Sequence, residues 1–254
     1  MTSRNKTTAF GSRVYGLGVM AFGIIGLTWR NFVPGQPVPR GFPGRTALAC
    51  AAAALMLLAG AAVEWRRTAA WGAAALTAYY ALAVVVLMNG RLLLTHYADF
   101  LTYDGIAEQL SIAAGALIVY AASAQIRSAL ALRLAHLGRL AFGICALVFG
   151  AAHFVYLNFT ASLVPKWLPP TQHFWACATG IGFLAAGVAL LTGVQARFVA
   201  ILLTVMLACF GLLVNGPILF ADHSLRDNWS ESAINLAITG VAWVVADSLA
   251  RQRR

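Results

Sequence analysis

Residues 198–214 read FVAILLTVMLACFGLLV, a stretch without a single charged side chain. A helix needs about 20 mainly apolar residues to cross the roughly 30 Å of hydrocarbon in a bilayer, and the flanking residues can supply the missing turn. Seven further apolar runs of similar length lie along the chain, at residues 14–29, 46–63, 69–88, 106–123, 140–159, 174–191 and 232–249. None of them alternates apolar and polar residues as the strands of a membrane barrel do. The pattern predicts an all-α membrane protein with about eight transmembrane helices.

The composition of the whole chain favours the same class. Hydrophobic residues make up 61% of the 254 positions, charged residues make up 10%, and the mean hydropathy is +0.77. Soluble domains carry about 25% charged residues, so these few charges could not cover a globular surface in water, whereas lipid requires no such cover. The four cysteines lie inside apolar runs and form no Cys-x-x-Cys pair. This indicates small hydrophobic side chains rather than a disulfide framework.

The formal net charge of +10 would suggest nucleic-acid binding in a soluble protein. Here the basic residues lie in short segments between apolar runs, so we expect no nucleic-acid partner. With eight spans, twelve of the 18 Lys and Arg residues fall on the side of the termini and six on the other side. Because cytoplasmic loops carry the excess of Lys and Arg, this predicts a multi-pass protein of the inner (plasma) membrane with both termini cytoplasmic. The first run ends in Thr28-Trp29-Arg30-Asn31, without a small-residue cleavage site, and we interpret it as a retained helix.

The chain resembles itself at a shift of 126 to 127 residues. Asn31-Phe32 recurs as Asn158-Phe159, and Asn89-Gly90 recurs as Asn215-Gly216. Four spans in each half return the chain to its starting side, so the pattern predicts two parallel four-helix repeats related by an axis along the membrane normal. The predicted organisation is a cytoplasmic segment over residues 1–13, a first repeat over 14–125, a cytoplasmic linker over 126–138, a second repeat over 139–250 and a basic cytoplasmic tail over 251–254.

The second half carries a specific motif order. His153-Phe154 ends a span, residues 164–169 read VPKWLP, and residues 179–187 read TGIGFLAAG in the next span. In this order the chain resembles the DoxX-like family of four-helix membrane proteins over about residues 140–249. The resemblance implies a quinone-linked role, because some members are associated with thiosulfate–quinone oxidoreductases and other redox systems. Many relatives carry a Glu at the position of Phe183, and the repeat-equivalent residue is Met56, so both halves lack this carboxylate and the resemblance does not extend to chemistry that uses it.

Five residues of the second half are candidates for binding a ligand: His153, Phe154, Trp167, Asn215 and Asn235. A histidine that ends an apolar helix can donate to a quinone carbonyl or a carboxylate and exchange protons near neutral pH. It can equally cap backbone or lipid headgroups at the interface. Asn215 ends a span where Gly and Pro follow, and a freed backbone carbonyl there could serve a ligand. We expect Asn235 to form a hydrogen bond across helices.

A polar cluster is expected in two repeat-equivalent outer loops. Its members are His96, Asp99, Glu108, Asp222, His223, Asp227 and Glu231. Each loop pairs a histidine with an aspartate, but two loosely spaced ligands fall short of the three or four that a zinc site requires, so we predict no metal. The alternatives are a solvated outer face with surface ion pairs, or a joint lid over an outward-facing cavity.

Three functions remain open from the sequence. The first is an accessory or quinone-interacting component of a membrane redox system, with other membrane redox subunits or further copies of the chain as partners. The second is a transporter or binder of a small hydrophobic molecule, built on parallel repeats. The third is a non-catalytic scaffold in the lipid bilayer, whose small-residue surfaces dock partner helices. No nucleotide loop, haem-attachment motif or nucleophile elbow occurs in the sequence, and we expect a protein that is not a stand-alone enzyme.

Overall fold

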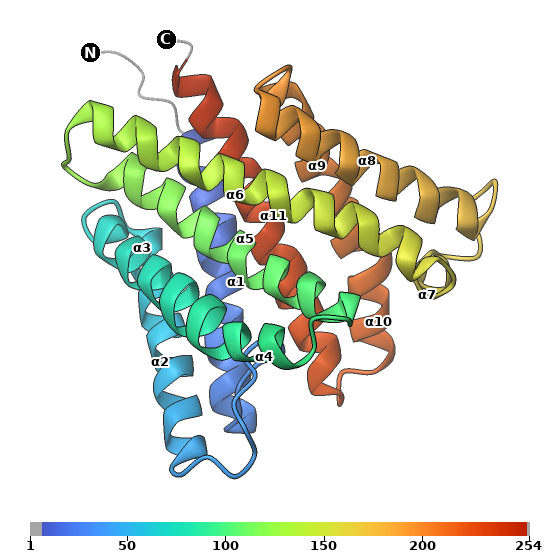
Figure 1. Cartoon of the computed structure of the whole chain (residues 1–254), viewed down its shortest axis with the longest axis horizontal. Helices are drawn as coiled ribbons and strands as arrows, with labels where there is room; N and C mark the ends of the chain where they lie inside the picture. Colours follow the sequence, from blue (N-terminus) through green and yellow to red (C-terminus); the bar gives the residue numbers. More distant parts are fainter. Residues whose placement is uncertain (1–6, 253–254) are drawn as a thin grey trace.

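A computed structural model describes residues 7–252 of the chain (Figure 1). Within this range no residue is in a β-strand, and eight helical segments are long and apolar enough to cross a membrane. The chain is therefore an all-α multi-pass membrane protein, which confirms the predicted fold class. Residues 1–6 and 253–254, which belong to the predicted cytoplasmic ends, lie outside the described residues.

The first four spans come from the first half of the chain. Their elements are α1 (Thr7–Trp29), α2 (Arg45–Glu64), α3 (Ala69–Ala78), η1 (Tyr79–Asn89), α4 (Gly90–Thr95) and α5 (Phe100–Ser123). The third span is one continuous segment, Ala69–Thr95, in which the π-helix η1 joins α3 to α4. Asp99 begins α5, because its side chain accepts a hydrogen bond of 3.0 Å from the backbone N–H of Leu101, which satisfies one of the free donors at a helix start.

The second half repeats this order. Its elements are α6 (Ser128–Val155), α7 (Leu157–Leu163), α8 (Gln172–Thr192), α9 (Ala196–Phe210), η2 (Gly211–Asn215), α10 (Gly216–Ala221) and α11 (Arg226–Gln252). The seventh span, Ala196–Ala221, again passes through a π-helical stretch, η2. The starts of α8 and α9 lie 127 residues after those of α2 and α3, and the start of α11 lies 126 residues after that of α5. The helix boundaries therefore follow the repeat predicted from the sequence.

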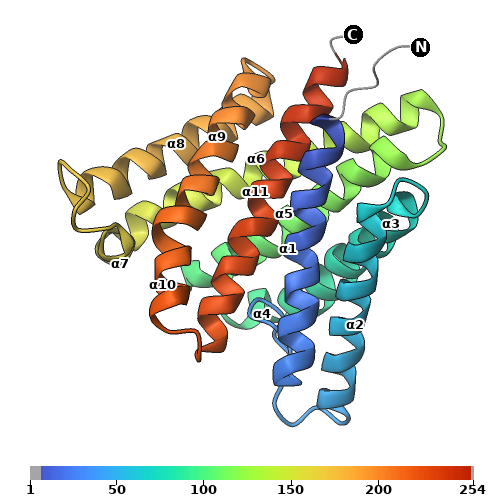
Figure 2. The same ribbon diagram turned by 180° about the vertical axis from the view of Figure 1, so that it is seen from behind.

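The helix packing is also repeated. In the first half α1 packs along α2, and in the second half α6 packs along α8. Between the halves, α1 packs along α11 and α5 packs along α6. These two contacts are equivalent, because the repeat relates α1 to α6 and α5 to α11. At the centre α5 crosses α11. The first turns of α1 and the last turns of α11 lie at one end of the molecule, and α4, α7 and α10 lie toward the other (Figures 1 and 2). The two halves therefore share one core.

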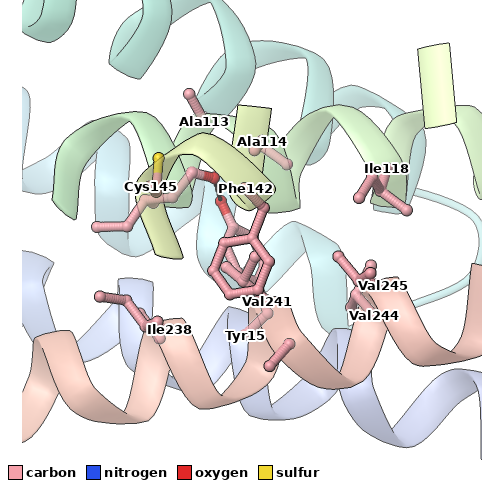
Figure 3. Close-up of a cluster of buried hydrophobic side chains, with 14 of the residues drawn as sticks. Tyr15, Ala113, Ala114, Ile118, Phe142, Cys145, Ile238, Val241, Val244 and Val245 are labelled. Carbon is pink, nitrogen blue, oxygen red and sulfur yellow. Dashed lines mark hydrogen bonds between the residues drawn. The ribbon is translucent and has the colours of Figure 1, made fainter. Parts of the chain in front are cut away.

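The central crossing is built from repeat-equivalent residues (Figure 3). Tyr15 and Phe142, which are 127 positions apart in the sequence, are both fully buried. A Cβ atom added to Gly115 of α5 would lie 2.6 Å from Val241 of α11, and these two positions are also repeat equivalents. Small residues let helix backbones approach closely in a membrane, where packing drives helix association. The Tyr15 hydroxyl donates to the backbone carbonyl of Ile112 at 3.0 Å, which satisfies its polar atom inside this apolar core.

Three predicted boundaries need correction. The expected linker over residues 126–138 is largely helical, because α6 already begins at Ser128. The fourth and eighth spans were expected to start at residues 106 and 232, but α5 begins at Phe100 and α11 at Arg226. Hydropathy places a span only where apolar residues dominate, whereas the hydrogen-bonded helices extend through their polar first turns.

Candidate functional site

A cavity of about 790 Å³ lies in the second half of the bundle. Its walls come from α6, α7, α8, α9, η2 and α11, and α5 of the first half closes it. All of these segments contribute residues near the end of the bundle that is opposite to the chain termini (Figures 1 and 2). Two wall residues, Leu101 of α5 and Phe159 of α7, are strongly exposed. Ligand cavities of this size accommodate drug-sized molecules.

His153 lies in this cavity, in the last turn of α6. Its Nδ1 atom lies 2.8 Å from the backbone carbonyl oxygen of Phe149. A carbonyl oxygen only accepts, so Nδ1 carries the proton, and in the neutral ring Nε2 keeps its lone pair. The imidazole lies against Phe183 with ring centroids 5.2 Å apart, and it is stacked at 25° with Phe210, 6.4 Å away. The neutral side chain therefore offers the cavity an acceptor, not the donor that the sequence suggested.

The two candidate asparagines line the cavity at the widened stretch η2. Asn215 ends η2, and Asn235 projects from α11 toward it. A Cβ atom added to Gly211 would lie 2.9 Å from the Asn235 side-chain oxygen, so glycine leaves room for this amide. The predicted hydrogen bond from Asn235 across helices is wrong for residues 7–252, because the only bond at this residue is accepted by its backbone carbonyl from Thr239. Within the described part of the chain, the side-chain amides of Asn215 and Asn235 form no hydrogen bond, so both can bind a ligand.

Three carboxyl groups also face the cavity, from Asp104, Glu108 and Glu231. The prediction that Glu108 and Glu231 lie in outer loops is wrong, because both are on helices, α5 and α11. Asp104 and Glu108 are four residues apart and therefore on one face of α5. Asp104 was not among the candidates, although its spacing from Glu108 on a helix was the signal that could have identified it.

The repeat explains why the cavity is found in the second half. In the first half the loop after α1 folds inward, and Gln36 is buried against Met56 and Tyr79, to which it is hydrogen bonded. Asn89, the equivalent of Asn215, holds this loop by donating to the carbonyl of Gly35 at 2.9 Å. In the second half the equivalent loop forms α7 instead, so Asn215 faces open space. We refer to the inserted segment, residues 32–36, as the plug.

The plug depends on one glycine. Gly35 has a φ of +80°, a conformation that suits glycine. A Cβ atom there would lie 2.2 Å from Nε2 of Gln109, a buried atom without a hydrogen-bond partner among the described residues. Gln109 is the repeat equivalent of Asn235, so the same position faces a plug in one half and a cavity in the other.

The remaining candidates lie outside the cavity. Trp167 is 70% exposed in the loop after α7, and Phe154 turns away from the cavity to pack on Gly180. Trp175, which was not among the candidates, lines the cavity and donates to the carbonyl of Pro169 at 2.8 Å. Three aromatic residues of the site were not recognised as such from the sequence: Phe149, Phe183 and Phe210. They belong to ordinary apolar runs, and only the packing distinguishes them.

The loop residues of the predicted polar cluster have local structural roles. The Asp222 carboxylate accepts hydrogen bonds from the hydroxyl and the backbone N–H of Ser224, which lower the pKa of this exposed group. The backbone carbonyl of His223 accepts from the indole of Trp229, and His96 is hydrogen bonded to the neighbouring Thr95. Asp227, on the first turn of α11, forms an exposed ion pair with Arg226 at 3.5 Å. Between residues 7 and 252, no three His, Cys, Asp or Glu side chains are arranged to hold a metal ion.

The comparisons with known proteins add one match. A family model described as a domain of unknown function (DUF8561) matches residues 142–216, less than a third of the chain. This stretch runs from the middle of α6 to the end of η2 and includes His153, Phe183 and Asn215, while the carboxyl groups of the cavity lie outside it. No curated protein and no solved structure matches the chain.

Proposed function

We propose that the protein binds a small amphiphilic molecule inside the membrane, in the cavity between α5, α6, α8, α9 and α11. The observation that carries this proposal is the cavity itself: a space of about 790 Å³ with mostly apolar and aromatic walls and a few convergent polar groups. Such a combination is typical of small-molecule sites. In the first half of the same scaffold the plug occupies the equivalent space, so a filled arrangement is available to this fold.

The position of the cavity suggests where its ligand enters. The wall residues extend from the middle of the bundle to the end away from the chain termini. If the termini are cytoplasmic, as the Lys and Arg count of the loops predicts, the ligand enters from the outer half of an inner membrane. The exposed wall residues on α5 and α7 support an opening beside lipid, which suits an amphiphile that partitions into the bilayer first.

The proposal predicts that filling the cavity removes its ligand. Met206 lines the cavity, and its repeat equivalent in the first half is Tyr79. A Met206→Tyr variant therefore introduces a side chain that this scaffold already accommodates. Val205→Tyr is the matched control, since Val205 is 55% exposed and is not part of the wall. Molecules that co-purify with the protein in lipid nanodiscs are then quantified by mass spectrometry.

We expect at least one small molecule at stoichiometric level with the unmodified chain and with Val205→Tyr, and its loss in Met206→Tyr. Equal amounts in all three proteins would overturn the proposal, because occupancy would then not depend on the cavity.

A quinone-linked redox role is a second candidate, supported by the resemblance to DoxX-like proteins and by His153 between Phe183 and Phe210. In its neutral form His153 accepts through Nε2, so it would bind a quinol hydroxyl rather than a quinone carbonyl. The amides of Asn215 and Asn235 can donate to a carbonyl. Titration with decyl-ubiquinol and decyl-ubiquinone tests this role, and a His153→Phe variant should weaken quinol binding selectively. Equal affinity of both proteins for the quinol would exclude it.

A further inference from the structure

The cavity wall carries negative groups without a compensating positive group. Asp104, Glu108 and Glu231 face the space, and no Lys or Arg is among its wall residues. In the part of the chain that the structure describes, the one ion pair joins Arg226 and Asp227, outside the cavity. Among residues 7–252, no hydrogen bond reaches the side-chain oxygens of these three carboxyl groups, and the bond at Glu108 is to its backbone carbonyl.

Carboxyl groups in this position are costly within a membrane. An ionisable side chain inside a span normally faces a cavity and finds a partner there, because hydrocarbon cannot solvate its charge. Glu108 is half-buried on α5 and lines the cavity. Since the protein provides no cation for it, this carboxyl group is neutralised either by a proton or by a cation that enters the cavity.

We infer that the ligand of this cavity is an organic cation with a bulky apolar body. This inference rests on the proposed function, and it assigns the chemical class of the ligand. No three His, Cys, Asp or Glu side chains of residues 7–252 converge closely enough to hold a metal ion. The negative groups are therefore spread over a wall, which suits a large cation better than a point charge.

The helix register separates the polar level of the cavity from its apolar level. Glu231 lies near the start of α11 and Ile238 lies seven residues further on, a rise of about 10 Å along the helix. Asp104 is likewise near the start of α5, at the same end of the bundle. Phe149 and Phe183 lie at the deeper level. The cationic group of a ligand would thus lie near the opening, with its apolar body directed inward.

Aromatic side chains line the polar part of the cavity as well as its apolar part. Tyr156 and Trp175 line the cavity near the opening, together with Phe159 of α7. The face of an aromatic ring attracts a cation within about 6 Å, and rings of this kind recognise quaternary ammonium groups. An anionic ligand would be repelled by the carboxylates and by the negative faces of the aromatic rings. The wall therefore discriminates by charge as well as by size.

The test compares probes of similar shape and opposite charge. Tetraphenylphosphonium, tetraphenylborate and neutral triphenylphosphine oxide are titrated against the full chain in lipid nanodiscs, with empty nanodiscs as background. We expect saturable binding of the phosphonium and no saturable binding of the borate. Glu108→Gln and Glu231→Gln keep the side-chain shape, and each should weaken phosphonium binding about tenfold, or about 1.4 kcal/mol.

Asp227→Asn is the matched control, because Asp227 lies one turn from Glu231 on the same helix and is 76% exposed in its ion pair. Its affinity for the phosphonium should equal that of the unmodified chain. Equal binding of all three probes, or an unchanged affinity in both Gln variants, overturns the inference and leaves the proposed amphiphile site standing. If no probe binds and Met206→Tyr also loses no co-purified molecule, the proposed function itself is refuted.

Discussion

The crossing of α1 and α11 offers a sharp test of the packing. A Cβ atom added to Gly240 of α11 would lie 2.3 Å from the backbone nitrogen of Tyr15 and 2.5 Å from its Cα. Contact between non-bonded carbon atoms is most favourable at about 3.5 to 4.0 Å. A Gly240→Ala variant therefore forces the two helices apart by about 1 Å, since neither obstructing atom belongs to a flexible side chain.

The expected cost is at least that of an overpacked core, about 1 to 3 kcal/mol. The separation also loosens the burial of Tyr15, whose hydroxyl bonds to α5. For a chain of this size such a loss lowers the melting temperature by about 2 to 4 °C per kcal/mol. Thermal unfolding in a mild detergent, followed by the fluorescence of a thiol-reactive dye, measures it, because Cys145 of the core becomes accessible when the helices separate.

Gly105→Ala is the matched control for this variant. Gly105 lies on α5, and a Cβ atom there would meet nothing within 4 Å. The same substitution should then be neutral or stabilising by up to about 1 kcal/mol, since alanine favours helix more than glycine does. If Gly240→Ala melts at the temperature of the unmodified chain, α1 and α11 are not in the contact described here.

Three further predictions concern other parts of the molecule. Tyr15→Phe should cost about 0.5 to 1.5 kcal/mol and keep the fold, as equilibrium unfolding in denaturant will measure, since the ring stays and one hydrogen bond is lost. Asn89→Ala removes the donor to the Gly35 carbonyl, so hydrogen exchange of the plug amides should become faster while exchange in the second half is unchanged. The pKa of Asp222 is lowered by hydrogen bonds from Ser224. The ionised carboxylate therefore stabilises the folded loop at any pH above the ordinary pKa of a carboxyl group, and this stabilisation is lost as the pH falls through the lowered pKa. Fragment-resolved hydrogen exchange between pH 7 and pH 3 should show protection of the Ser224 amide falling only in acid.

The span pattern was predictable because it depends on sums over many residues. Each of the eight segments contains an 18-residue window of high hydropathy with few charges, and no single side chain decides it. The repeat was visible for a similar reason. Asn89 and Asn215, both at the ends of π-helical stretches, keep the same place in both halves.

The carboxyl groups of the cavity were assigned to loops because the start of a helix depends on hydrogen bonds of single residues, not on the hydropathy of a long segment. The Asp99 side chain caps α5 and allows the helix to begin six residues before the apolar run. Hydropathy does not register where such a helix starts, so Glu231, one residue before the run 232–249, was assigned to a loop. Glu108 was grouped with the loop residues although it lies just inside the run 106–123. A polar residue one or two turns outside an apolar run can still lie on the helix, facing whatever that helix faces.

The cavity itself was not predictable from composition. It exists because the loop after α6 forms α7 and stays outside, while the loop after α1 enters the bundle as the plug. That difference depends on tertiary contacts such as the bond from Asn89 to Gly35, and both loops look alike in proline content and polarity. His153 was a ligand-binding candidate from the sequence and lines the cavity, but its hydrogen-bonding role follows only from the distance of Nδ1 to the carbonyl oxygen of Phe149.

The pairing of α1 with α11 has a consequence for the order in which the protein assembles. Chains are made from the N-terminus, so α1 enters the bilayer first, while the helix against which Gly11 and Gly18 pack is made last. Until α11 arrives, this narrow face of α1 has only lipid beside it. In a nascent chain stopped before Arg226, α1 would therefore lack its packing partner, and the bundle is complete only when α11 packs against α1.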